Sequence, residues 1–367
     1  PFLYPGSPSF AEAQRRDLLV RTLGGQPYVE PWTFTARSYL DFTSAAATRW
    51  WQRRVRFALT VLGFDGAMLD FGEGAPLDAR YAAGRSGALV HNLYPVLYVR
   101  AAHEVGQAVK PGDAVFFARA GYSGSQAYTT GRFPCDQARS WDRERGLPAA
   151  LAAMLSGSLS GWPYWGPDIA GYFDGGWALG PPEERERRRQ AEKELWIRWV
   201  QLGALSPTMR DMLGAQRDPV GLWTDSETLQ VFRAYARLHT ALVPYLYRYA
   251  ELAHRQGLPI LRPLFLNYPG EAATYTVDDQ YLLGDDVLVA PVLQPGQTRR
   301  RLYLPAARWQ HYWTGQLHSG PGWVTIPAPL HHIPLFLREG LSLKLPAPQD
   351  LGTLGEGARV IQTGPWR

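Results

Sequence analysis

The feature that most constrains the fold is an alternation of apolar, strand-like runs with helix-like segments up to about residue 275. The expected strands are residues 66–71, 114–119, 162–169 and 261–266, and the expected helices are residues 45–62, 94–109, 147–159, 183–202 and 227–256. Strands that alternate with helices predict a parallel sheet covered by helices, in the α/β class.

Beyond that point the pattern contains strands only. The expected strands are residues 281–283, 287–292, 301–304, 309–313, 323–326 and 333–337, and Pro or Gly turns separate them. Short strands of this kind predict an antiparallel β-sandwich. We therefore expect one domain over residues 1–275 and a second, smaller domain over residues 276–367.

Composition excludes several classes of protein. Of 367 residues, 46% are hydrophobic and the net charge is only +5, so the chain is not disordered. The single cysteine, Cys135, excludes a disulfide scaffold, and no apolar stretch is long enough to cross a membrane. No basic run interleaved with aromatic residues indicates nucleic acid. We expect neither nucleic acid nor membrane as a partner; homo-oligomerisation and cellular location are left open.

Charged side chains follow several of the apolar runs. Asp70 and Glu73 end the first expected strand, and Arg119 ends the second. Asp136 lies in a loop, and Asp168 lies among aromatic residues. Any one of these acids could simply cap a helix or a turn. That explanation is weakest for Asp70, because a charge at the mouth of an apolar strand needs a partner or a chemical role.

Several acids and an arginine at the ends of strands fit glycoside hydrolysis. In that reaction one carboxylate attacks the anomeric carbon and another carboxyl group protonates the leaving oxygen. The nucleophile must be ionised, which a neighbouring guanidinium favours, whereas the acid needs an apolar or anionic setting. The apolar neighbours of Asp136, which are Phe133, Pro134 and Cys135, agree with the second requirement.

At these residues the chain resembles glycoside hydrolase family 31, the retaining α-glycosidases, from residue 1 to about residue 345. Ordered motifs carry the resemblance. They are Gly63-Phe64-Asp65-Gly66 leading to Asp70-Phe71-Gly72-Glu73, then residues 119–126, 165–172, 198–207 and 261–265, and finally residues 279–285 leading to 288–292. The resemblance implies a (β/α)8 barrel, here about strands 3–8, followed by a C-terminal β-sandwich, and no cofactor.

The resemblance also implies roles for single residues. Asp70 would be the nucleophile that forms a covalent glycosyl ester, and Asp136 the general acid and then the base. Arg119 would hold sugar hydroxyls, and Asp168 would orient Arg119 or the substrate. Glu73 would support the nucleophile. Trp165 and Tyr172 would line the subsite of the cleaved sugar, and Gln137 would contact the substrate.

Within the family, Asp-Phe-Gly-Glu at residues 70–73 resembles the bacterial branch that contains α-xylosidases and sulfoquinovosidases. The pair Asp136-Gln137 followed by Trp141 is more similar to sulfoquinovosidases, and so is Tyr172, which in those enzymes helps to bind the sulfonate. Tyr172 is equally well explained as a packing aromatic residue. An α-glucosidase or α-xylosidase of the same family stays an alternative.

The chain departs from the family pattern at three places. Two of them, Met212 and the late start of the chain, favour a further alternative, a degenerate relative that binds sugar without cleaving it. Met212 stands where the family usually has a histidine that binds sugar hydroxyls, and Cys135 stands where a glycine commonly precedes the acid. Residues 1–4 resemble the end of the third barrel strand, so we expect this chain either to belong to a longer protein or to fold poorly and lack activity. The pair His331-His332 is not expected to bind a metal, since adjacent residues of a strand point to opposite faces.

Overall fold

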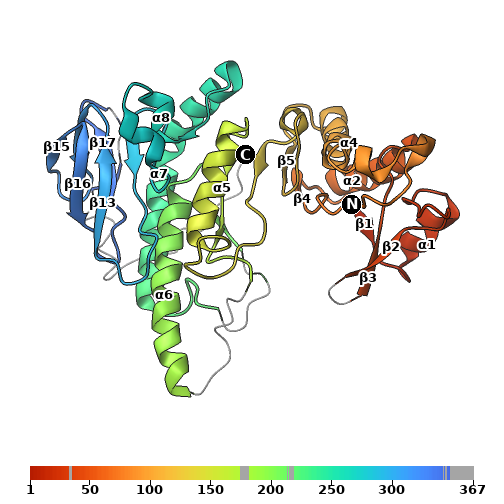
Figure 1. The fold of residues 1–367 in the computed structure, drawn as a ribbon, viewed down its shortest axis with the longest axis horizontal. Coiled ribbons are helices and arrows are strands. Elements are labelled where there is room, and N and C mark those ends of the chain that lie inside the picture. Colours follow the sequence, from red (N-terminus) through yellow and green to blue (C-terminus); the bar gives the residue numbers. More distant parts are fainter. Residues whose placement is uncertain are drawn as a thin grey trace. The chain divides into compact units, whose positions relative to one another are not determined.

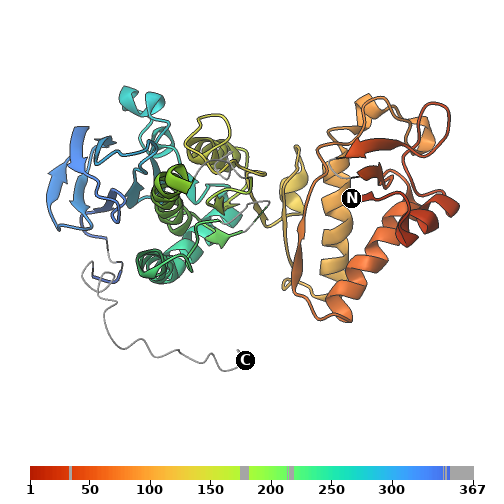
Figure 2. The ribbon, with the colours of Figure 1, turned by 90° about the horizontal axis from the view of Figure 1, so that it is seen from below.

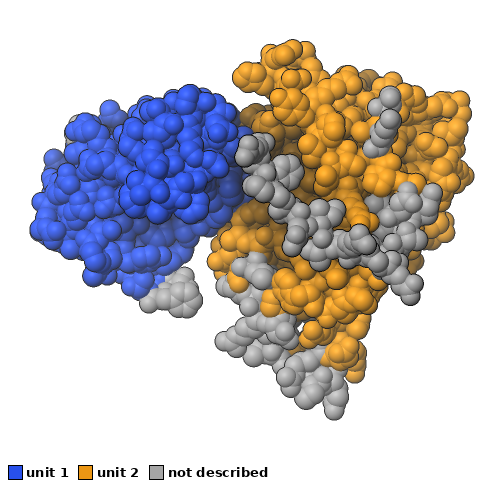
Figure 3. All heavy atoms as spheres, turned by 180° about the vertical axis from the view of Figure 1, so that it is seen from behind, with its two compact units in different colours: residues 1–133 blue, residues 134–367 orange. Residues whose placement is uncertain are grey.

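The computed structural model describes residues 1–32, 35–173, 182–212, 214, 219–341, 343 and 345–347. The chain forms two compact units, residues 1–133 and residues 134–367, which Figure 3 shows in two colours. Among the described residues, no helix is both long enough and apolar enough to span a membrane.

Unit 1 contains a parallel sheet and a smaller antiparallel one. The parallel strands are β4 (Gly66–Leu69), β5 (Val115–Ala118) and β6 (Gly131–Arg132). The antiparallel strands lie in the order β1 (Phe2–Leu3), β3 (Thr35–Tyr39) and β2 (Val29–Trp32). The helices are α1 (Pro8–Arg15), α2 (Ala45–Thr60), α3 (Gly87–Val90) and α4 (Tyr94–Val109).

The helices α2 and α4 pack side by side in unit 1 (Figures 1 and 2). Helix α2 begins after Ser44, whose hydroxyl accepts from the Ala47 amide, and its buried residues are Ala47, Trp50, Val55 and Leu59. Helix α4 has Pro95 in its first turn. Amides of the first turn have no partner within the helix, so the N–H that proline lacks costs no hydrogen bond. Trp50 of α2 and Tyr94 and Tyr98 of α4 join the core of unit 1.

Unit 2 begins with a helical layer. Its long helices are α5 (Leu147–Leu159), α6 (Pro182–Ala204) and α7 (Ser226–Gln256). An Asp225–Thr228 capping box starts α7, and Gly257, with φ +73°, ends it. Short strands accompany the helices: β7 (Tyr164–Trp165), and β8 (Asp168–Ile169) parallel to β9 (Arg210–Asp211).

The C-terminal part of unit 2 contains two antiparallel sheets around a core of their own, as expected for a β-sandwich. Strands β13 (Arg299–Leu304) and β16 (Gly322–Pro327) form the smaller sheet. The larger sheet has the order β10 (Leu261–Arg262), β11 (Tyr281–Leu283), β12 (Val287–Val289), β17 (Leu335–Arg338), β14 (Arg308–His311) and β15 (Leu317–Ser319).

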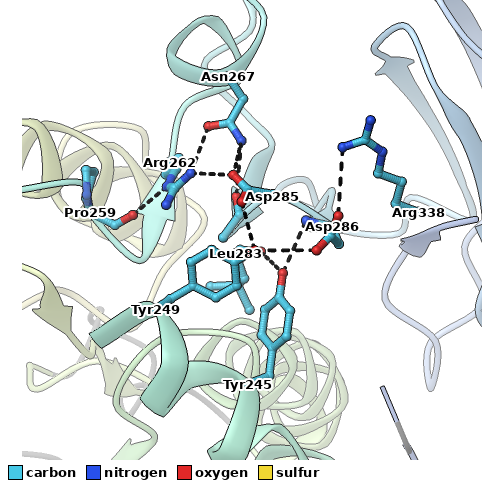
Figure 4. Close-up of polar contacts among 10 residues, drawn as sticks. Tyr245, Tyr249, Pro259, Arg262, Asn267, Leu283, Asp285, Asp286 and Arg338 are labelled. Carbon is cyan, nitrogen blue, oxygen red and sulfur yellow. Dashed lines mark hydrogen bonds and ion pairs between the residues drawn. The ribbon is translucent and has the colours of Figure 1, made fainter. Parts of the chain in front are cut away.

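A polar cluster joins α7 to this larger sheet (Figure 4). Arg262 of β10 is 3% exposed and donates from Nη1 to Oδ1 of Asp285 at 2.6 Å. Asn267 donates to the same oxygen at 2.8 Å, and the Tyr249 hydroxyl of α7 donates to Oδ2 at 3.0 Å. The buried guanidinium is therefore neutralised at the point where the helical layer meets the sheet.

Most expected elements are confirmed, and two differ. Residues 162–169 form two short strands rather than one, because Gly166 and Pro167 separate β7 from β8. The expected strand 261–266 stops at Arg262; Pro263 follows, and residues Leu264–Asn267 form the short helix α8. Several elements were not expected, among them α1, α3, β2, β3, β9 and β15. The domain boundary between residues 275 and 276 stays a prediction.

Candidate active site

Two residues of unit 1 meet because their strands are parallel neighbours. Strand β4 pairs with β5 so that Leu69 lies opposite Ala118. Asp70 and Arg119 therefore leave the sheet together at its carboxyl edge, and the Arg119 amide donates to the Leu69 carbonyl at 3.3 Å. Carboxyl ends of parallel strands are where α/β enzymes place their reactive groups.

Arg119 lies between two carboxylates. Its Nη1 is 3.4 Å from Oδ1 of Asp70, and its Nη2 donates to Oε1 of Glu73. The guanidinium side chain is 6% exposed, whereas Asp70 and Glu73 are 33% and 51% exposed. A buried cation thus contacts two accessible carboxylates.

Phe71 turns the chain immediately after Asp70. Its φ of +60° lies in the left-handed region, which an aromatic residue rarely adopts. The strained conformation lets its amide donate to Oδ1 of Asp70 at 2.9 Å, and its ring lies 3.9 Å from the Arg119 guanidinium carbon. The rings of Phe2 and Trp32 pack against the Phe71 ring, with ring centroids 4.7 and 5.6 Å from its own. Aromatic packing from a neighbouring sheet therefore fixes the orientation of the Asp70 carboxylate.

A second arginine supports the loop after β5. Arg132 is 7% exposed and donates to the Ala120 carbonyl, and a Cβ at Gly121 would lie 1.8 Å from its Nη2. Burial lowers the pKa of Arg132 to about 10, and the negative charge of Glu73 opposes that shift. Burial also raises the pKa of Tyr98, with smaller contributions from Asp70 and Glu73. Sequence reasoning did not single out Arg132, because it follows no motif of its own.

In unit 2, Gln137 connects the Asp136 loop to β8. Its Nε2 donates to the Cys135 carbonyl, and its Oε1 accepts from the Asp168 amide at 3.2 Å. Cys135 itself has φ +65°, so the chain turns sharply just before Asp136. Asp136 is half-buried, whereas Gln137 is 4% exposed. The structure thus gives Gln137 a supporting position beneath Asp136; the expected contact with substrate stays a prediction.

Asp168 is fully buried and pairs with an arginine of the adjacent strand. Strand β8 lies parallel to β9 with Asp168 opposite Arg210, and Nη1 of Arg210 contacts Oδ1 of Asp168. Nη2 of the same guanidinium lies against the Met212 sulfur. Met212, the departure from the family pattern, therefore lies on the same arginine that holds Asp168. The contact between Arg210 and Asp168 was not predicted, because no sequence pattern indicates that these two short strands pair.

The two predicted aromatic residues lie close to this segment. Trp165 is 7% exposed, and its ring packs on Gly157 of α5 so closely that a Cβ there would lie 1.7 Å from it. The Tyr172 amide donates to the Gln137 carbonyl at 2.8 Å, which brings Tyr172 beside the Asp136 loop. The Tyr172 ring covers Gly214, where a Cβ would lie 2.3 Å from Cδ2.

The predicted residues thus form two groups, one in each unit. Unit 1 brings together Asp70, Glu73 and Arg119. Unit 2 contains Asp136, Gln137, Trp165, Asp168 and Tyr172, and hydrogen bonds link Gln137 to the backbone of Asp168 and Tyr172. The convergence of Asp70 and Asp136 on one sugar stays a prediction. Among the described residues, no group of three or more His, Cys, Asp or Glu side chains could hold a metal ion.

Two protein-family models match the chain. The model for the glycosyl hydrolases family 31 TIM-barrel domain matches residues 1–249, and the model for the glycosyl hydrolase family 31 C-terminal domain matches residues 257–342. These matches confirm the expected barrel followed by a C-terminal domain. They also agree with the parallel strands and the antiparallel sheets described above.

Individual relatives agree with these models. The sulfoquinovosidase of Escherichia coli strain K12 is 36% identical over 331 residues, covering 89% of this chain and 47% of that protein. Alpha-glucosidase 2 of Bacillus thermoamyloliquefaciens is 30% identical over 352 residues, covering 92% and 42%. The solved structure of a family 31 sulfoquinovosidase from E. rectale with an aza-sugar inhibitor superposes with a TM-score of 0.85 at 29% identity, covering 93% and 50%. The chain spans about half the length of the curated relatives it matches.

Proposed function

Because the chain belongs to glycosyl hydrolase family 31, we propose that it carries the reacting carboxyl groups of a retaining α-glycosidase that removes terminal α-linked sugars. One observation carries the proposal. The buried Arg119 guanidinium contacts Asp70 and Glu73 at the carboxyl edge of β4 and β5, and it leaves Asp70 accessible. A carboxylate that a guanidinium holds in place and leaves accessible suits the role of a glycosidase nucleophile.

In the first step, an Asp70 oxygen attacks the anomeric carbon and the glycosidic C–O bond breaks. The departing oxygen takes the proton of the Asp136 carboxyl group, which leaves a glycosyl ester on Asp70. In the second step, Asp136 accepts a proton from water as that water attacks the same carbon. The ester bond breaks, Asp70 regains its negative charge, and the sugar leaves with its original anomeric configuration.

The structure offers each carboxyl group its own support. The Phe71 amide and the Arg119 guanidinium fix Oδ1 of Asp70. The Gln137 side chain links the carbonyl of Cys135, the residue before Asp136, to the amide of Asp168 in β8. Reacting groups held in this way lose little freedom when substrate binds, which lowers the barrier of both steps.

For the substrate, we propose an α-linked sulfoquinovoside, a sugar that carries a sulfonate. The similarity to two sulfoquinovosidases supports this choice. Tyr172 supports it as well, because its amide is anchored to the carbonyl of Gln137, the residue after Asp136, and a phenol hydroxyl can donate to an anionic sugar substituent. An α-glucoside and an α-xyloside are the competing substrates.

The test compares turnover of 4-nitrophenyl α-sulfoquinovoside, α-glucoside and α-xyloside by the purified chain and by its Asp70→Ala variant. We expect the sulfonated substrate to be preferred, and the variant to lose about 10³-fold or more in kcat. Asp113→Asn, which changes an exposed acid elsewhere in unit 1, should be unaffected. Equal turnover by Asp70→Ala would contradict the proposed nucleophile, and preference for glucoside would contradict only the substrate.

Two further measurements examine the mechanism. A fluorinated α-glycosyl fluoride should label the chain by the mass of one sugar, on the peptide that contains Asp70. Proton NMR of the first product should show the α anomer. A β anomer, or a label on another peptide, would refute the double-displacement mechanism.

One observation favours a second function, sugar binding without hydrolysis. Met212, which stands where the family usually has a sugar-binding histidine, lies with its sulfur against Arg210, and a thioether is only a weak hydrogen-bond acceptor. If calorimetry detects sulfoquinovose binding while neither turnover nor labelling of Asp70 occurs, the chain is a binding protein. Measurable turnover with retention eliminates this alternative.

A further inference from the structure

A hollow on the surface of unit 1 is lined mainly by arginine. It has a volume of about 320 Å³ and lies along α2 where that helix packs on α4. Its lining residues are Arg49, Gln52, Arg53, Arg56, Glu104 and Val105. None of them belongs to the candidate active site, which lies at the carboxyl ends of β4 and β5.

The spacing of the arginines places them on one face of α2. Residues 49, 53 and 56 are separated by four and three positions, so their side chains neighbour one another along the helix. All three are exposed, whereas Ala47 and Val55 are buried on the opposite side of the helix. Like charges at this spacing destabilise a helix, and α2 contains no acidic residue to offset them.

The surroundings do not neutralise these charges. Among the described residues, Arg49, Arg53 and Arg56 take part in no ion pair. By contrast, Arg54 on a different face of α2 contacts Glu12 at 2.9 Å. The one acid in the lining, Glu104, is 3.5 Å from the Arg100 guanidinium and accepts from Gln52 at 2.9 Å. The hollow therefore holds three guanidinium groups against one carboxylate, which also contacts Arg100.

From this arrangement we propose that the hollow binds a small polyanion that carries phosphate groups, such as pyrophosphate. Each guanidinium presents parallel N–H donors that match two oxygens of a phosphate, and three of them suit a ligand with more than one negative charge. The volume of the hollow is suited to a small ligand of this kind. The site is separate from sugar hydrolysis and does not depend on it.

Calorimetry with pyrophosphate tests the proposal directly. We expect saturable binding by the chain, weakened about tenfold or more in Arg53→Gln and further in the Arg49→Gln, Arg53→Gln double variant. Arg16→Gln is the matched control, because it removes one exposed charge of unit 1 outside the hollow. We expect its affinity to stay within about twofold of the parent's, since only long-range attraction changes.

The outcomes separate clearly. Absence of binding by the parent chain at millimolar pyrophosphate overturns the proposal, and so does an equal loss in Arg16→Gln, which would indicate diffuse attraction to a basic surface. Circular dichroism of the variants should match the parent's, since the substituted side chains are exposed. The hollow variants should also hydrolyse glycosides at the parent's rate, so a failure of glycosidase activity leaves this test intact.

A phosphate group could also come from a lipid headgroup. Co-sedimentation with phosphatidylglycerol vesicles distinguishes the two sources. Binding of pyrophosphate without vesicle binding assigns a soluble polyanion. Binding of both, with both lost in the double variant, assigns a headgroup at the same site. Vesicle binding that the double variant retains, without pyrophosphate binding, contradicts the proposal.

Discussion

The Nη1 atom of Arg119 lies 3.4 Å from Oδ1 of Asp70, although the two residues follow different strands of unit 1. The parallel register of β4 and β5 produces this contact, since Leu69 and Ala118 lie opposite each other. The same guanidinium stacks on Phe71 and contacts Glu73. One buried cation thereby holds the proposed nucleophile in position.

Arg119→Gln should lower glycosidase kcat by about 10²- to 10³-fold, the usual cost of removing a preorganised polar group from a reacting centre. The variant leaves Asp70 and Glu73 as neighbouring negative charges without their shared cation. Arg119→Lys should recover only part of the loss, since one ammonium cannot contact both carboxylates as a fork does. Steady-state kinetics on an aryl α-glycoside measures this, with the exposed Arg15→Gln as control. A kcat unchanged in Arg119→Gln would show that the guanidinium has no part in the reaction.

Gln137→Ala should lower kcat by about 10²-fold while KM changes little, because misplacing a reacting group affects the transition state more than substrate binding. The substitution removes the link between the Cys135 carbonyl and the Asp168 amide. Gln137→Glu keeps the shape but cannot donate to the carbonyl, so it should also fail to restore kcat. The matched control is Gln190→Ala, on the exposed face of α6. A rise in KM alone would instead assign Gln137 to substrate binding.

Asp285→Ala should lower the free energy of unfolding by about 3–5 kcal/mol, the cost of leaving a buried cation without its partner. Arg262 is 3% exposed, and Asp285 is the carboxylate that its Nη1 contacts (Figure 4). Urea denaturation followed by fluorescence measures the loss. Asp278→Ala breaks only an exposed contact at 3.9 Å with Arg143 and should cost less than about 1 kcal/mol. Similar losses in the two variants would show that burial of Arg262 contributes nothing.

Local signals in the sequence predicted the elements that depend on local structure. Helices 94–109 and 147–159 have the expected bounds, because each begins with a proline in its first turn and continues with an apolar face. The two acids and the arginine at strand ends were found by the same logic. The break at Gly166 and Pro167 between β7 and β8 was missed, and so was the helix after Pro263. Apolar composition alone shows neither where one strand ends and the next begins nor where a short helix replaces a strand.

Contacts between distant segments could not be predicted in this way. Arg210 meets Asp168 only because two strands of two residues each lie side by side, and no periodicity indicates their register. The left-handed backbone conformation of Phe71 could not be predicted from the sequence either. Its ring packs against Phe2 and Trp32, which belong to another sheet. The parts of the site missed by sequence reasoning are therefore tertiary contacts.

The C-terminal sheets should lose stability in acid through His311. Burial lowers the pKa of His311 to about 4, and the nearby His318 and His332 act in the same direction. The ring is 7% exposed, packs 5.0 Å from Phe336 and contacts the Thr314 hydroxyl through Nδ1 at 2.8 Å. Because the unfolded chain binds the proton near pH 6.5 and the folded chain does not, the stabilising contribution is complete above that pH and is lost progressively as pH falls to about 4. At about 1.4 kcal/mol per pKa unit, the total is about 3 kcal/mol.

Urea midpoints measured between pH 7.5 and pH 4 should therefore fall more steeply for the parent chain than for His311→Gln, which has no proton to bind at this position. Carboxylates titrate in both proteins, so the difference between the two curves isolates the histidine. His254→Gln, which changes an exposed histidine near the end of α7, should follow the parent's curve. If His311→Gln and the parent lose stability in parallel, protonation of the buried ring is not what destabilises the sheets in acid.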